Sequence, residues 1–158
     1  MWRKPLPMPL EELHFQPTDG LPVQFRGYKL YERTSSEDNI IDDDNSLYVL
    51  TLYYEDCGLL CLTVEYRCQS SFLREHGKPR LDVVRNINYC DVANYLVSYD
   101  FAGPVNIDYY GSGHCCLMEV AAKLHFDLVT TFQLMAARFL EQVAVQRKVW
   151  WQYFDIRF

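Results

Sequence analysis

The spacing of apolar residues in the first half of the chain predicts β-strands. Gln24–Tyr31 alternates between apolar and polar residues, which is typical of a strand with one buried face. Leu47–Tyr54 and Leu59–Tyr66 are rich in strand-forming residues and enclose the short turn Glu55–Gly58, so they predict a hairpin. Both runs are apolar on both faces near their centres. We therefore expect a central hairpin, with a layer packed on each side or a partner chain covering one.

The middle of the chain has a different period. Aliphatic residues recur every three positions in Arg80–Val92, which predicts a helix of about three turns. After it, Asn94–Phe101 and Pro104–Tyr110 flank Ala102-Gly103 and predict a second hairpin.

The C-terminal part predicts a long amphipathic helix. Asp127 is a suitable N-cap, and an apolar stripe follows it at steps of four and three: Leu128, Phe132, Met135, Phe139 and Val143. Leu117–Leu124 fits the end of a strand as well as the start of a helix. The aromatic residues of the tail either close the core or face a partner: Trp150, Trp151, Phe154 and Phe158.

These elements predict one α+β domain with an antiparallel sheet built from two hairpins and a long C-terminal helix, in the order β-β-β-α-β-β-α. Residues 1–33 form a segment rich in proline and aromatic residues, in which Leu10–Leu13 could make one short helical turn. Residues 34–46 form an acidic loop, and residues 47–158 form the α+β core.

Composition narrows the possible partners. The net charge of −6 and the absence of a dense Lys/Arg block disfavour nucleic-acid binding. Twelve Tyr, nine Phe and three Trp suit either an aromatic, strand-rich core or a protein interface. The chain starts without a signal peptide, and its apolar runs stay below the ~18 residues of a membrane span, so we expect a soluble, cytoplasmic protein with no membrane partner.

Metal and cofactor sites are not predicted. Asp42, Asp44 and Ser46 have the spacing of a calcium loop, but Leu47 and Tyr53 occupy the places where that motif needs Gly and Glu. No two cysteines form a CxxC pair, and without a signal peptide we expect free thiols, mostly buried: Cys57, Cys61, Cys68, Cys90, Cys115 and Cys116. The histidines His14, His76 and His125 are isolated in the sequence.

The best catalytic candidate is the segment Gly111–Cys116. Cys115 and Cys116 follow His114, and an imidazole can lower the pKa of a thiol. Neighbours in sequence point in different directions, however, and no third group that would orient the histidine can be identified. Glu65 lies in the apolar hairpin without a second carboxylate. We therefore predict no catalytic residues and a protein that is not an enzyme.

The pattern of elements resembles the small acidic fold of type III secretion chaperones and of the YbjN family. The matching stretches are Gly58–Arg67, Arg80–Asn88, Ala93–Gly111 and Leu124–Val143. The usual N-terminal helix of that fold is replaced here by the proline-rich segment. The resemblance implies a bacterial homodimer that binds a partner polypeptide.

Three functions follow as hypotheses. The first is a non-catalytic protein-binding module, chaperone-like or regulatory, whose binding residues are unknown. The second is a small acidic inhibitor or immunity-type protein that would contact a basic target through Glu37–Asp44. The third is a thiol enzyme that would use Cys115 or Cys116 with His114.

Overall fold

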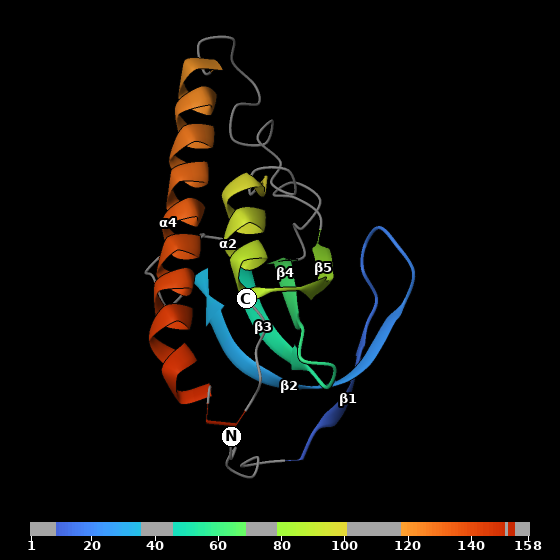
Figure 1. The fold of residues 1–158 in the computed structure, drawn as a ribbon. Coiled ribbons are helices and arrows are strands. Elements are labelled where there is room, and N and C mark those ends of the chain that lie inside the picture. Colours follow the sequence, from blue (N-terminus) through green and yellow to red (C-terminus); the bar gives the residue numbers. More distant parts are fainter. Residues whose placement is uncertain (1–8, 36–45, 69–78, 101–117, 151, 154–158) are drawn as a thin grey trace.

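The computed structural model describes residues 9–35, 46–68, 79–100, 118–150 and 152–153 of the chain, with side chains of the last helix from Thr130 onward, Thr131 excepted. Five strands precede two helices (Figure 1). The elements are β1 (Glu11–Phe15), β2 (Val23–Thr34), β3 (Ser46–Glu55), β4 (Leu60–Cys68), β5 (Arg80–Ile87), α2 (Tyr89–Ser98) and α4 (Met118–Trp150). The predicted α+β class, with an antiparallel sheet and a long C-terminal helix, is confirmed.

The strands form one antiparallel sheet in the order in which they occur along the chain, β1-β2-β3-β4-β5. The predicted strand at Gln24–Tyr31 is part of β2, and the predicted hairpin is β3–β4, paired from Ser46↔Cys68 to Tyr54↔Leu60. The hairpin lies in the middle of the sheet, as its apolar runs indicate.

The helices cover one face of the sheet. Alternate residues of β3 and β4 point toward them and are buried, and the buried residues of the helices pack against this layer: Tyr48, Leu50, Leu52, Leu60, Leu62, Val64 and Tyr66 from the sheet, and Val92, Leu96, Phe132, Met135, Phe139 and Val143 from the helices. The Tyr48 ring meets the Phe132 ring edge-on, with centroids 4.5 Å apart. Burying these side chains stabilises the fold by about 1.5–3 kcal/mol for each large one.

The apolar stripe predicted for the C-terminal helix is confirmed for Phe132, Met135, Phe139 and Val143, which are all buried. Trp150 is also buried, so this ring of the tail closes the core. Leu128 belongs to α4, but its side chain is outside the described ones, as are Trp151, Phe154 and Phe158.

The other face of the central hairpin is buried too, because the sheet curls. The Phe15 ring of β1 lies 5.2 Å from the Tyr53 ring of β3, measured between centroids. The loop between β1 and β2 reaches the far edge of the sheet, where Thr18 N–H donates to the carbonyl of Leu81 in β5 at 2.9 Å. Residues on this face are buried although no helix covers them: Val49, Thr51, Cys61 and Thr63. The expectation of a layer on both sides of the hairpin is therefore confirmed.

The predicted helix at Arg80–Val92 is wrong for most of its length. Arg80–Ile87 is the strand β5, because pairing with β4, for example Val84 with Leu62, outweighs the three-residue spacing of its aliphatic side chains. The strand ends where Asn86 takes a positive φ of 58°. Asn88 then caps α2, since its side chain accepts from Asp91 N–H at 3.0 Å and the Asp91 carboxylate accepts from Asn88 N–H at 3.3 Å.

The predicted strand Asn94–Phe101 is also wrong, because residues up to Ser98 belong to α2. Val92 and Leu96, four residues apart, are its buried residues, and this helical spacing outweighs the alternation of Tyr95 and Val97. Pro104–Tyr110, the other half of the predicted second hairpin, lies outside the described residues.

Two smaller predictions are corrected. The short helical turn at Leu10–Leu13 is instead the start of β1, which pairs with β2. Asp127 is not an N-cap, because α4 is already helical from Met118. The residues Met118–Leu124 include Met, Glu, Ala, Lys and Leu, which favour a helix and extend it upstream. Across the described helices, none is both long and apolar enough to cross a membrane.

Candidate functional site

The residues on which the sequence hypotheses depend are mostly outside the described part. These are the catalytic candidates His114, Cys115 and Cys116 and the acidic stretch Glu37–Asp44 with its calcium-like spacing. Among the described residues, no group of three His, Cys, Asp or Glu side chains lies close enough to hold a metal ion. His14 is exposed on β1, with its Nε2 3.9 Å from a carboxylate oxygen of Glu12.

The described cysteines are free thiols in different environments. Cys57 and Cys90 are exposed, whereas Cys61 is fully buried in the curl of the sheet. Burial raises the pKa of the Cys61 thiol to about 12, and the nearby Glu55 carboxylate adds to the rise. A thiol with so high a pKa carries almost no thiolate at neutral pH, so Cys61 is a packing residue.

The first charged cluster joins the β3–β4 turn to β5. Glu55, at the end of β3, is buried, and its Oε1 accepts from Arg85 Nη2 at 2.6 Å and from Nε at 3.2 Å. Its other oxygen accepts from the backbone N–H of Asn86 at 3.4 Å. The Arg85 guanidinium lies 5.1 Å from the centroid of the Phe25 ring. The carboxylate is thus held by its neighbours, as a buried charge requires.

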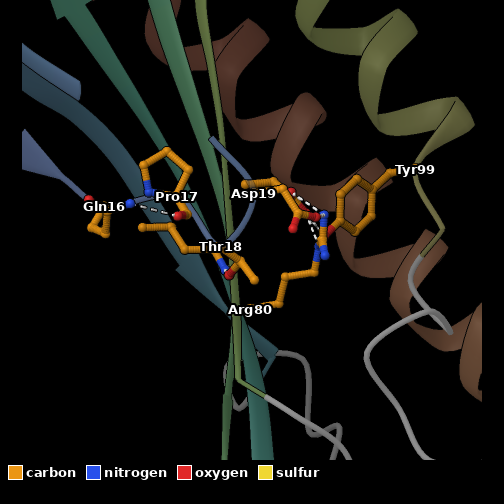
Figure 2. Close-up of polar contacts among 8 residues, drawn as sticks. Gln16, Pro17, Thr18, Asp19, Arg80 and Tyr99 are labelled. Atoms are coloured by element: carbon orange, nitrogen blue, oxygen red, sulfur yellow. Dashed lines mark hydrogen bonds and ion pairs between the residues drawn. The ribbon is translucent and has the colours of Figure 1, made fainter. Parts of the chain in front are cut away.

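The second charged cluster joins three elements (Figure 2). Arg80 of β5 donates through Nε and Nη2 to the two carboxylate oxygens of Asp82, both at 2.9 Å, and its Nη2 lies 2.7 Å from Asp19 on the β1–β2 loop. The Tyr99 hydroxyl, one residue after α2, donates to Asp82 at 2.5 Å. Burial raises the pKa of Tyr99, and the Asp82 carboxylate raises it further.

Both clusters connect elements of the fold to one another. Glu55 and Arg85 are 30 residues apart in sequence, and Asp82 and Tyr99 are 17 apart, so neither pair leaves a local sequence motif. Every charged group of the two clusters is engaged by another group of the same chain, and their chemistry is that of structural ion pairs.

Glu65 has a partner that the sequence did not indicate. Its carboxylate lies 2.9 Å from Arg67 Nε, two residues along β4 on the same face. The pair borders an open hollow of about 320 Å³ beside the first residues of β5, lined also by Thr18, Pro79, Arg80 and Leu81. Because the hollow adjoins residues 69–78, which are not described, it carries no functional argument.

The apolar surface of the two helices is different, because part of it is not covered by other described residues. A groove of about 270 Å³ runs between α2 and α4, and it is lined by Leu96, Val97, Gln133, Ala136, Ala137 and Leu140. Val97 is 76% exposed at its edge, while Leu96 at its base is buried. The alanines of α4 are short, and this leaves room between the helices. The groove is the best candidate for a binding site in the described part of the chain.

The sequence contained a signal for this groove that was missed. Within α2, Val97 follows Leu96 directly, so the two side chains point about 100° apart on a helix and cannot both be buried against the sheet. The signal depends on recognising Tyr89–Ser98 as a helix, and the alternating aromatic residues favoured a strand there.

Comparison of the chain with protein families, with curated proteins and with solved structures gives no match.

Proposed function

We propose that this protein is a non-catalytic binding module that holds an amphipathic helical segment of a partner polypeptide in the groove between α2 and α4. The observation that carries the proposal is the exposed Val97 beside an apolar groove with a buried base. Helical segments dock in such grooves by inserting side chains spaced three or four residues apart.

The size of the groove favours side chains over a small molecule. At about 270 Å³ it is slightly below the ~300–1,000 Å³ of typical small-molecule sites, and its lining has one polar side chain, Gln133. This volume suits one or two aliphatic side chains of a polypeptide. Small-molecule sites also need several polar groups to fix the orientation of the ligand.

Charge indicates the chemistry of the partner. Helix α2 (Tyr89–Ser98) contains no Lys or Arg, its first turn carries the exposed Asp91, and Asp100 follows the helix. The chain has a net charge of −6. We infer that the partner segment has basic residues beside its apolar anchors, because opposite charges accelerate association and discriminate against acidic competitors.

A chaperone-like or regulatory role, as the resemblance to the YbjN family and to type III secretion chaperones implies, fits this binding mode. A cytoplasmic location is consistent with the exposed thiols of Cys57 and Cys90. No observation among the described residues favours the inhibitor hypothesis or the thiol-enzyme hypothesis, since both depend on residues outside this part.

The test is to screen helical peptides with apolar anchors, with and without basic flanks, by fluorescence anisotropy against the intact protein. Val97→Asp should weaken binding of the selected peptides at least about tenfold, because it places a charge at the edge of the apolar groove. Methyl resonances of Val97 and Leu140 should shift on titration.

Leu21→Asp is the matched control. Leu21 is 83% exposed on the β1–β2 loop, far along the fold from the groove, and the substitution is of the same kind. Peptide binding should survive it. The proposal is overturned if no peptide binds or if Val97→Asp and Leu21→Asp have equal effects.

A further inference from the structure

The outward face of α4 carries a second apolar surface, separate from the groove. Leu134, Val145 and Val149 are 52%, 60% and 53% exposed. They lie on the side of the helix opposite to the buried Phe132, Phe139 and Val143, as their positions in the helical repeat require. An exposed aliphatic stripe on a surface helix is a candidate interface.

Together with exposed polar residues, these side chains form a stripe at steps of four, four, three, four and four: Thr130, Leu134, Arg138, Glu141, Val145 and Val149. Leu134 and Val145 are eleven residues apart, which is close to three full turns, so the stripe stays on one face of a nearly straight helix. Over residues 130–149 it extends for about 29 Å at ~1.5 Å per residue.

The order of residues in the stripe is complementary to its own reverse. An antiparallel second copy of α4, related by a twofold axis that passes between Phe139 and Leu140, places Leu134 opposite Val145 of the second copy. The same axis places Arg138 opposite Glu141 of the second copy, and Thr130 opposite Val149. Each contact occurs twice, as a twofold interface requires, and the two charge pairs meet at the axis.

We propose that two copies of this chain associate through the outward face of α4, antiparallel, with Arg138 and Glu141 pairing across the axis and Leu134 packing against Val145 on either side. Charge complementarity selects a second copy as the occupant, because the stripe contains one basic and one acidic residue at positions that exchange under the twofold operation. The groove between α2 and α4 lies beside this seam and stays open in the dimer.

A seam of one helix from each copy is small among stable interfaces, so we expect a reversible dimer that dissociates in the micromolar range. Sedimentation equilibrium of the intact protein measures its dissociation constant. Arg138→Glu places two acidic residues opposite each other at both contacts, and it should raise the constant at least about tenfold. Glu141→Arg should do the same with the opposite charge.

The double variant Arg138→Glu with Glu141→Arg decides the question, because it restores opposite charges across the axis and should return the dissociation constant to within about threefold of the wild-type value. Arg26→Glu, an equal charge change at an exposed position of β2, is the matched control and should leave it unchanged. Circular dichroism of each variant confirms that the chain is folded.

A wild-type protein that stays monomeric up to about 100 µM overturns the proposal, since a micromolar interface would be saturated there. A dimer that neither single charge reversal nor Val145→Glu weakens also overturns it, because the contact then lies elsewhere. Val97→Asp should leave dimerisation unchanged, which separates this result from the test of the groove.

Discussion

Oε1 of Glu55 accepts two hydrogen bonds from Arg85, from Nη2 at 2.6 Å and from Nε at 3.2 Å, and this pair fastens the β3–β4 turn to the edge strand β5. Arg85→Ala leaves the buried Glu55 carboxylate without its cation. We expect a loss of about 3 kcal/mol in the free energy of unfolding, at the low end for buried pairs because the Arg85 side chain is 35% exposed. Urea denaturation measures the change.

The double variant Glu55→Met with Arg85→Met is the informative companion. It removes both charges and keeps apolar bulk, so it should be more stable than Arg85→Ala alone. A double variant as unstable as the single one would show that the pair stabilises the turn through its own hydrogen bonds.

Tyr99→Phe removes the hydroxyl that donates to Asp82. At neutral pH we expect a loss of about 1.5 kcal/mol, as for a hydrogen bond to a charged group. The effect should depend on pH, because burial and the Asp82 carboxylate raise the pKa of Tyr99 above its ordinary value of 10.0. Above pH 10 the unfolded chain releases this proton while the folded chain keeps it, so the stability that Tyr99 contributes is complete below pH 10 and is lost as the pH rises.

The stability difference between wild type and Tyr99→Phe should therefore narrow above pH 10, by at most about 1.4 kcal/mol per pH unit. Urea titrations at pH 8, 10 and 11 measure it. A difference that stays constant over this range would contradict the raised pKa of the folded state.

Thr18 fastens the β1–β2 loop to β5, because its hydroxyl accepts from the backbone N–H of Leu81 at 2.8 Å. Thr18→Val removes the acceptor and keeps the shape of the side chain. We expect a loss of at most about 1 kcal/mol and faster hydrogen exchange at the Leu81 amide. Thr18→Ser keeps the hydroxyl and should leave the exchange rate close to that of the wild type; equal acceleration in both variants would count against this role.

Cys61 should resist alkylation in the native protein. Its pKa of about 12 leaves roughly one thiolate in ten thousand at pH 8, and the side chain is fully buried. Iodoacetamide labelling followed by peptide mass mapping should modify the exposed Cys57 quickly and Cys61 only after unfolding. Comparable rates for the two would contradict the buried site. A fast label on Cys115 or Cys116 near pH 6 would favour the thiol-enzyme hypothesis instead.

The central strands could be predicted from sequence because their local signals agree. Leu47–Tyr54 and Leu59–Tyr66 combine strand-forming residues with a turn that fits a hairpin, and tertiary packing follows the same pattern. The region from Arg80 to Ser98 could not be predicted this way. Its spacing suggests a helix and then a strand, whereas pairing with β4 and the Asn88–Asp91 cap impose the reverse order. The Asn88–Asp91 spacing is the signal that could have placed the helix start.

The candidate site was less predictable than the fold. The groove exists only because α2 and α4 lie side by side, and the charged clusters join residues far apart along the chain, such as Glu55 and Arg85. Local sequence patterns do not report distances of this kind. The contacts of Thr18 with Leu81, 63 residues later, likewise depend on the curl of the whole sheet.

The strand order β1-β2-β3-β4-β5 has a consequence for synthesis of the chain. Each strand emerging from the ribosome finds its hydrogen-bonding neighbour already made, so the sheet can grow in the direction of translation. Its apolar face, with Tyr48, Leu50 and Leu62, stays uncovered until α4 follows, more than fifty residues after β4 begins. Ribosome-bound chains that end before Met118 therefore present an adhesive surface, and this is the stage at which general cellular chaperones would engage the nascent protein.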